Sequence, residues 1–314
     1  MMTLLAHAKI NLYLEIIGNR ADGFHELVMI MQSVDLADRI TLNPLNTPNT
    51  RLLCDHPLVP TDHTNLAYKA VMLLQKRFPH RTNRYGGVEI TIDKKIPVGA
   101  GLAGGSSNAA ATLFGLNVLW QLGLTRIELQ ELGAELGSDV PFCLAGGCAI
   151  ATGRGEEIDS LHNTPKLSAV LAKYTSLAVS TPWAYKTYRQ QFEHTYLPLK
   201  DTASLEERQA RVHSGKMVGA LGTHDATAIG RHLRNDLEKV VLPAHAKVRQ
   251  LKETMAAQGG LGTLMSGSGP TVFTLTETPD QAQSVLQSVR QQISDPDLQL
   301  HLVQFTSQGI RQES

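Results

Sequence analysis

Residues 94–111 have the sequence KKIPVGAGLAGGSSNAAA, a glycine-rich turn followed by two serines and a run of alanines. Apolar residues alternate with polar ones over residues 88–93, which predicts a strand leading into the turn. Apolar residues then recur at helical spacing over residues 109–120. Glycines let a backbone approach a ligand closely, and free N–H groups at the start of a helix favour an anion. The pattern predicts either a phosphate-binding loop or a tight strand-to-helix turn.

Three known kinds of phosphate-binding loop can be compared with this one. The Walker form needs a lysine directly after its last glycine, and none follows here. Gly99, Gly101 and Gly104 have the spacing of the dinucleotide fingerprint, but residues 94–97 separate them from the strand, and no strand ending in an acid follows. The protein-kinase form needs H-R-D and D-F-G segments, which the sequence lacks. We therefore interpret the fingerprint as accidental.

The composition fits one large or two ordinary domains. Of the 314 residues, 42% are hydrophobic, and 29 Lys and Arg balance 29 Asp and Glu. This balance argues against a surface built to bind nucleic acid. Cys54, Cys143 and Cys148 are widely spaced, which argues against a disulfide framework or structural zinc. Because no signal peptide or bilayer-length apolar run is found, we expect a cytoplasmic protein without nucleic-acid or membrane partners.

The first half of the chain predicts a mixture of strands and helices. Residues 66–75 are helical in composition, and a capping box at Thr125 and Glu128 begins a helix that Gly137 ends. The segment SDVPF, residues 138–142, is then expected to be a short exposed connection. Residues 8–16 alternate, which predicts a strand whose polar face carries Lys9, Asn11, Tyr13 and Glu15.

The second half predicts an α+β domain, because strands and helices alternate in it. The expected elements are helices near residues 248–255 and 282–293 and strands at 263–266, 271–275 and 301–305. A domain boundary is expected within residues 155–170, and we place it between two domains of residues 1–162 and 163–314. Residues 195–220 include a polar, irregular stretch that predicts a surface insertion.

Three segments together resemble the motifs of the GHMP small-molecule kinase family. They are AHAKINLYLEI at residues 6–16, IPVGAGLAGGSSNAAA at 96–111 and MSGSGPTVF at 265–273. The resemblance covers essentially the whole chain and implies an α+β fold of two domains, the first like ribosomal protein S5 domain 2 and the second ferredoxin-like. It also implies an ATP-dependent enzyme that uses Mg²⁺ and phosphorylates an alcohol group. The residues that would hold the metal stay unknown, with Ser106 as one candidate.

The resemblance assigns catalytic roles to Asp139 and Lys9. Asp139 would be the general base that takes the proton of the accepting hydroxyl, although an acid after a helix break is also a common capping residue. Lys9 would be its partner, although a lone lysine on a strand is often a solvated surface charge.

The same resemblance predicts the nucleotide site. The phosphates of ATP are expected on Pro97, Val98, Gly99, Ala100, Gly101, Leu102, Ala103, Gly104, Gly105, Ser106 and Ser107. Ala100 and Ala103 stand where relatives often have glycine. Because alanine is strained at positive φ, we expect ordinary φ at both positions.

Within the family, the segments GNRADGFHEL and STPWAYK resemble members that phosphorylate the 2-hydroxyl of a cytidine diphosphate derivative of methylerythritol. Phe24 and Tyr185 would then sandwich the pyrimidine, although ordinary core packing would also account for two such rings. His25 would select cytosine by hydrogen bonding. Further expected substrate contacts are Asn11, Lys94 and Thr181.

Three rival interpretations stay open at the level of the sequence. The first is another kinase of the family, acting on homoserine, mevalonate or a sugar. The second is a non-catalytic module that binds a nucleotide or RNA, and the third is the dehydrogenase that the fingerprint would suggest. We expect a monomer or a weak homodimer.

Overall fold

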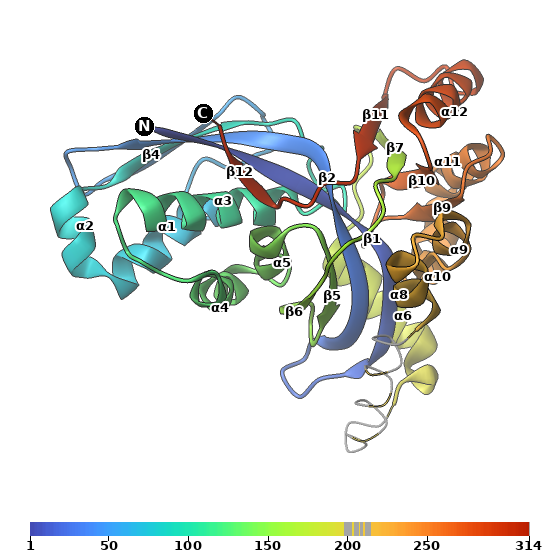
Figure 1. Ribbon diagram of the computed structural model, residues 1–314, viewed down its shortest axis with the longest axis horizontal. Coiled ribbons are helices and arrows are strands. Elements are labelled where there is room, and N and C mark those ends of the chain that lie inside the picture. The colour runs from blue at the N-terminus through green and yellow to red at the C-terminus, as the bar shows by residue number, and fades with distance from the viewer. Residues whose placement is uncertain (198–202, 204–206, 208–209, 211–214, 314) are drawn as a thin grey trace.

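The computed structural model describes residues 1–197, 203, 207, 210 and 215–313, and these residues form two sheets with helices packed against them (Figure 1). The larger sheet has the order β12-β1-β2-β4-β3, with β5 added beside β2, β6 beside β5, and β8 beside β1. Its strands are β1 (Met2–Asn19), β2 (His25–Pro44), β3 (Thr50–Cys54), β4 (Val88–Asp93), β5 (Cys148–Thr152), β6 (Glu157–Leu161), β8 (Arg234–Asn235) and β12 (Ile310–Gln312).

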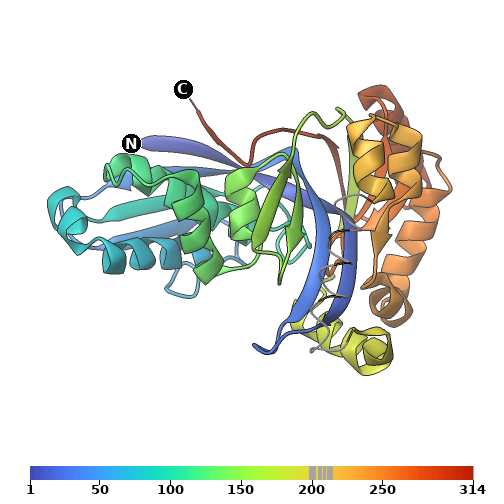
Figure 2. The same cartoon turned by 60° about the horizontal axis from the view of Figure 1, so that its bottom comes forward.

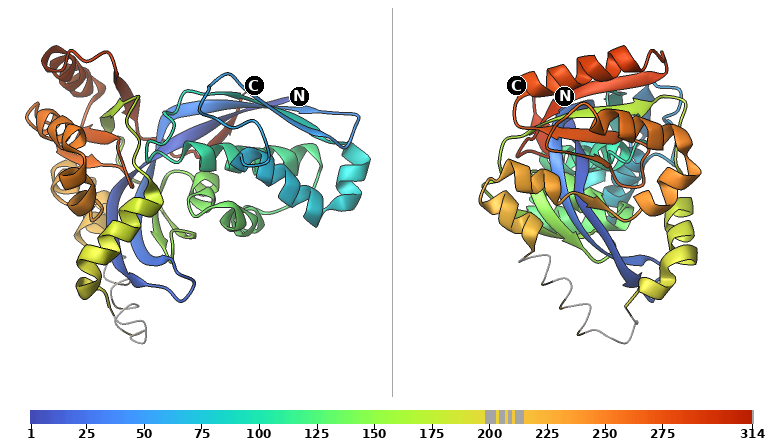
Figure 3. Two further views of the ribbon diagram at one scale, coloured as in Figure 1. Left: turned by 180° about the vertical axis from the view of Figure 1, so that it is seen from behind. Right: turned by 90° about the vertical axis from the view of Figure 1, so that its right-hand side faces the viewer.

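Five helices of the first half cover one face of this sheet (Figure 3). The small residues of α3 allow it to pack directly on the strands: Ala109, Ala110 and Ala111 are fully buried, and a Cβ on Gly115 would lie 2.3 Å from a methyl group of Leu42. The predicted capping box at the start of α4 is confirmed. The helices are α1 (Leu66–Arg77), α2 (Pro79–Tyr85), α3 (Gly104–Leu119), α4 (Arg126–Leu136) and α5 (Val140–Ala145).

The second half is built on a four-stranded antiparallel sheet of order β11-β7-β10-β9. When its strands are numbered along the chain, their order across the sheet is 4-1-3-2. Helices lie between the first and second strands and between the third and fourth, which is the ferredoxin-like arrangement that was expected. Its strands are β7 (Ser168–Tyr174), β9 (Gly262–Met265), β10 (Val272–Thr276) and β11 (Leu298–Gln304). Its helical elements are α6 (Thr181–Phe192), η1 (Glu193–Thr195), α8 (Lys216–Gly222), α9 (Ala226–Arg231), α10 (Glu238–Ala244), α11 (Ala246–Ala256) and α12 (Pro279–Gln292).

The two halves share the long curved hairpin of β1 and β2, which runs from the first sheet down beside the helices of the second half (Figure 2). The predicted boundary at residues 162 and 163 lies in the connection from β6 to β7. After the second sheet is complete, the chain returns and β12 pairs antiparallel with β1. Among the described residues, no helix combines the length and the apolar character needed to cross a bilayer.

Several local expectations are wrong. Residues 138–142 are not an exposed connection, because Val140 to Phe142 are buried at the start of α5, where their apolar side chains pack. Ala100 has an ordinary φ, but Ala103 has a φ of 57°, because it ends a sharp turn immediately before α3. Most of the predicted insertion near residues 195–220 lies outside the described residues.

The predicted polar face of β1 is split by a bulge. The register with β2 shifts between Asn11 and Tyr13, and such a bulge changes which face the following side chains take. Lys9 and Asn11 therefore line one cavity, whereas Tyr13 and Glu15 lie on the other side of the strand.

Candidate active site

A cavity of about 830 Å³ opens where the glycine-rich loop, β1, α6 and the β9–β10 connection meet. The predicted catalytic and substrate-binding residues line it together with residues 97–106 of the loop. Ser107 is the exception among the predicted site residues. It is fully buried, and its hydroxyl donates to the His7 carbonyl at 2.7 Å. Ser107 therefore ties α3 to β1 and does not face the cavity.

Lys9 and Asp139 are far apart in the sequence and meet in the cavity. The Nζ of Lys9 lies 3.7 Å from Oδ2 of Asp139, and it donates to Oδ1 of Asn11 at 2.7 Å and to the Gly101 carbonyl at 3.2 Å. Lys9 is 4% exposed, so it is not a solvated surface lysine. Asp139 precedes α5, but its side chain makes no capping hydrogen bond. Its carboxylate is therefore open to the cavity, beside a fixed ammonium group.

The glycine-rich loop turns sharply before α3. Gly101 has a φ of 73°, and a Cβ there would lie 2.3 Å from the carbonyl oxygen of Ser266, so both its conformation and its neighbours require glycine. Among the described residues, no side chain caps α3, and its first turn contains no acidic residue. The first turn, residues 104–106, lines the cavity. Its free N–H groups and the positive end of the helix dipole suit a phosphate there.

Asp38 is a site-forming residue that escapes prediction from the sequence. It is fully buried on β2, and its carboxylate accepts hydrogen bonds from the backbone N–H groups of Lys95 and Ile96 and from the Asn108 amide, each at 2.8 Å. It also pairs with the ammonium group of Lys94. One carboxylate thus fastens the chain before the loop and the first helical turns after it. Lys94 lines the cavity, but its charge is already paired.

The ring side chains gather at another part of the cavity wall. Phe24 is 50% exposed, which core packing does not explain, and the Arg154 guanidinium carbon lies 5.1 Å from the centre of its ring. The rings of His25 and Tyr185 have centroids 5.2 Å apart. Burial, aided by the charge of Arg189, lowers the pKa of His25, so its ring is neutral at pH 7. Its Nε2 is buried without a hydrogen-bond partner among the described residues.

The hydroxyl of Tyr185 faces the same low-dielectric surroundings. Burial is the main cause that raises its pKa, and the negative charge of Asp139 adds to the effect. The Tyr185 side chain therefore stays neutral and can present both its ring and a hydroxyl to a ligand.

Two further segments complete the wall. Thr181, the first residue of α6, has its hydroxyl 2.8 Å from that of Ser268. This contact joins the start of α6 to the glycine turn at residues 267–269. Residues 58–60 and 64–66 also line the cavity, which the sequence did not indicate. Their only signal is the N-cap residue Asn65, whose side chain accepts from Ala67 at 2.8 Å, and this predicts a helix start but no site.

The cavity suits a metal that is bound chiefly by phosphates. Among the described residues, no group of three or more His, Cys, Asp or Glu side chains is placed to hold an ion. Mg²⁺, however, usually keeps water ligands and binds nucleotide phosphates with few protein groups. The hydroxyl of Ser106 lies 3.9 Å from the position of a Cβ on Gly137, next to the turn that carries Asp139. A phosphate-bound Mg²⁺ fits these residues.

Comparison with known proteins identifies the class. The model of the GHMP kinases N terminal domain matches residues 65–147, and that of the GHMP kinases C terminal region matches residues 217–295. Solved structures of the same fold include homoserine kinase from Cytophaga hutchinsonii, with a TM-score of 0.74 at 20% identity over 99% of this chain and 97% of that one. The chain belongs to the GHMP kinase family and is an ATP-dependent small-molecule kinase.

Relatives that match nearly the full chain are more specific. A protein of Gloeothece citriformis is 60% identical over 99% of this chain and 98% of its own length, and one of Nostoc punctiforme is 57% identical over 98% and 97%. Both are named 4-diphosphocytidyl-2-C-methyl-D-erythritol kinase. A crystal structure of 4-(cytidine 5'-diphospho)-2C-methyl-D-erythritol kinase has a TM-score of 0.74 at 31% identity, over 97% of this chain and 99% of that one. These relatives do not support a dehydrogenase or a non-catalytic module.

Proposed function

We propose that this kinase transfers the γ-phosphoryl group of ATP to the 2-hydroxyl of 4-diphosphocytidyl-2-C-methyl-D-erythritol, giving the 2-phosphate and ADP. The relatives at 51% to 60% identity bear the name of that activity. The observation in this chain that carries the proposal is one cavity lined by three features. These are the Lys9–Asp139 pair, the uncapped start of α3, and the rings of Phe24, His25 and Tyr185.

In the proposed reaction, the Asp139 carboxylate accepts the proton of the 2-hydroxyl. The hydroxyl oxygen forms a bond to the γ-phosphorus, and the bond from that phosphorus to the bridging oxygen breaks, so ADP leaves with the electron pair. Lys9 lies close enough to Asp139 to stabilise negative charge near the attacking oxygen. The N–H groups of residues 104–106 would hold the phosphates. Catalysis of this kind rests mainly on positioning and charge stabilisation.

Ser106 is the residue that we propose as a protein ligand of Mg²⁺, together with phosphate oxygens of the nucleotide. The metal supplies positive charge that neutralises the phosphates. Ser107 would not contact the nucleotide, since its hydroxyl and N–H already donate to the carbonyls of His7 and Ala103.

The pyrimidine of the acceptor would stack on Phe24 and Tyr185. Arg154 covers part of the Phe24 ring, which leaves the rest of this half-exposed ring to a base. Stacking of this kind contributes about 1–3 kcal/mol per base. The neutral His25, which lines the cavity, would hydrogen-bond the base, and Asn11 and Thr181 would contact the methylerythritol part. We further propose a cytoplasmic monomer or weak homodimer that does not bind nucleic acid, consistent with the balanced charge.

The test is an ADP-release assay with Mg-ATP and the cytidine compound, run beside homoserine and mevalonate. Release with the cytidine compound alone is the expected result. Preferred phosphorylation of homoserine or mevalonate would keep the kinase and remove the proposed substrate.

The Asp139→Asn variant tests the catalytic base. It should lose turnover by about 10²-fold or more and keep its affinity for ATP, measured by calorimetry. Asp280→Asn makes the same chemical change at an exposed residue of α12 and should turn over normally. If Asp139→Asn retained near-normal turnover, Asp139 could not be the base.

A further inference from the structure

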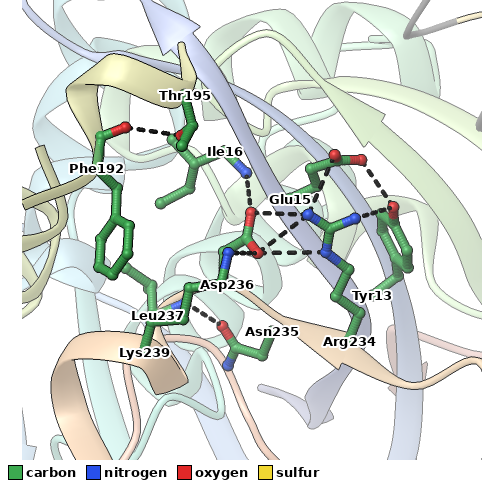
Figure 4. A network of polar contacts seen from close by, with 10 residues as sticks. All are labelled: Tyr13, Glu15, Ile16, Phe192, Thr195, Arg234, Asn235, Asp236, Leu237 and Lys239. Atoms are coloured by element: carbon green, nitrogen blue, oxygen red, sulfur yellow. Dashed lines mark hydrogen bonds and ion pairs between the residues drawn. The ribbon is translucent and has the colours of Figure 1, made fainter.

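The two-residue strand β8 lies parallel to β1 beside Tyr13 and Leu14, and its two side chains enter separate networks. Arg234 forms ion pairs with Glu15 at 3.2 Å and with Asp236 at 3.1 Å, as Figure 4 shows. Asp236 also accepts the backbone N–H of Ile16 at 3.0 Å. This charged network fixes the segment against β1 and has no contact with the catalytic cavity, because neither Arg234 nor Asp236 lines it.

Asn235 makes a different set of contacts. It is 5% exposed, and its amide nitrogen donates to the carbonyls of Met265 and Gly267 at 2.7 Å and 2.8 Å. Its amide oxygen accepts the N–H of Leu237 at 3.0 Å (Figure 4). Both donors and an acceptor are therefore used, and only this orientation of the amide satisfies them, since a flipped amide would bring oxygen against two carbonyls.

The residue between Met265 and Gly267 is Ser266, which contacts the glycine-rich loop of residues 97–106, called the phosphate loop below. Its hydroxyl donates to the Gly101 carbonyl at 3.0 Å and accepts the N–H of Asn11 at 3.3 Å. The same Gly101 carbonyl receives the Lys9 ammonium, and a Cβ on Gly267 would lie 3.5 Å from Lys9 Nζ. A shift of this turn would therefore move the surroundings of Lys9 directly.

We propose that Asn235 is a positioning residue of the phosphoryl transfer. It holds Ser266 and the glycine turn at residues 267–269 against the phosphate loop, and so fixes Lys9 relative to Asp139. The inference rests on the catalytic roles proposed above for Lys9 and Asp139. It adds a residue outside the cavity that acts on the reaction through the backbone of that turn.

The Asn235→Asp variant tests the proposal, because it keeps the size of the side chain and turns its two donors into acceptors that face carbonyl oxygens. Misplacement of catalytic groups by about 1 Å can cost about 10²-fold, so kcat should fall by about 10- to 100-fold. The KM for ATP should change by less than about threefold, since the α3 N–H groups stay in place. A protonated aspartic acid regains one donor, so kcat relative to the unsubstituted enzyme should rise as the pH is lowered.

Asp236→Asn is the matched control. It removes a buried charge from the same segment and leaves the Asn235 contacts intact, so it should lower the urea midpoint while kcat stays within about twofold. If Asn235→Asp keeps kcat within about twofold, or if both variants lose kcat equally, the proposal is overturned. Should Asn235→Asp not fold, Ser266→Ala must show the same loss of kcat, and a normal kcat there would also overturn it.

An incorrect substrate assignment would be recognised separately. In that case the unsubstituted enzyme would release ADP with another acceptor. The variant kcat ratios are measured with whichever acceptor the unsubstituted enzyme phosphorylates, so they test Asn235 in either case.

Discussion

The Asp38→Ala substitution removes the carboxylate that the two ends of the phosphate loop share. Asp38 is fully buried, and the Lys94 side chain with which it pairs is only 5% exposed. Removing one partner of a buried ion pair costs about 3–5 kcal/mol, because the other charge stays buried without compensation. The N–H groups of Lys95 and Ile96 also lose their acceptor, and an unsatisfied buried donor costs about 1–3 kcal/mol. We therefore expect a loss of at least about 4 kcal/mol in the free energy of unfolding, a large part of the stability of a typical domain.

Urea unfolding followed by tryptophan fluorescence measures this loss, and Trp120 is buried in the first half of the chain. The double variant Asp38→Ala/Lys94→Met removes the uncompensated ammonium group as well, so it should recover about half of the lost stability. Asp280→Ala, at an exposed position on α12, should cost less than about 1 kcal/mol. A loss below about 1 kcal/mol for Asp38→Ala, or no recovery in the double variant, would refute the reasoning.

Three further predictions concern the loop and pH. Gly101→Ala should raise the KM for ATP by about tenfold or more in the ADP-release assay. Gly123 has the same φ of 73° but no atom within 4 Å of an added Cβ, so Gly123→Ala should leave the KM unchanged. Ala103→Gly should leave the free energy of unfolding within about 0.5 kcal/mol, because relief of the strain at positive φ offsets the entropy that glycine adds to the unfolded chain. Ala100→Gly relieves no such strain and should lower the free energy of unfolding by about 1 kcal/mol or more. Equal losses would contradict the difference in φ. Burial lowers the pKa of His301 below 6.5, so near that pH the unfolded chain binds a proton that the folded chain does not, and the free energy of unfolding should fall as pH drops below about 6.5. The His301→Leu variant should flatten that fall in urea titrations from pH 7 to pH 5. An unchanged slope would show that His301 does not cause it.

Motifs made of consecutive residues were predictable, because their conformation is set locally. The glycine turn, the following α3 and the capping box of α4 all follow from spacing and residue type. The ferredoxin-like order of the second sheet was expected from the family resemblance, and the alternating strands and helices agree with it. The cavity lining by Phe24, His25 and Tyr185 also came from that resemblance, since residues so far apart in sequence give no signal of meeting.

What could not be predicted depends on contacts between distant segments. Asp38 lies within the long strand β2, and its role is visible only once the fold brings Lys94 and Asn108 to it. Asn235 likewise gives no signal in the sequence, because its role depends on its hydrogen bond to the Met265 carbonyl at the end of β9. The positive φ of Ala103 arises because the loop must reverse sharply before α3, and propensity alone argues against it.

The pairing of β12 with β1 has a consequence for how the protein is made. Residues 310–312 leave the ribosome long after residues 4–6, against which they pair. While the second half is being synthesised, β1 therefore waits with an unpaired row of backbone N–H and C=O groups at that edge, which is a template for wrong pairing. The larger sheet is therefore completed only after translation has passed through the second half, and the edge of β1 stays open to wrong pairing until then.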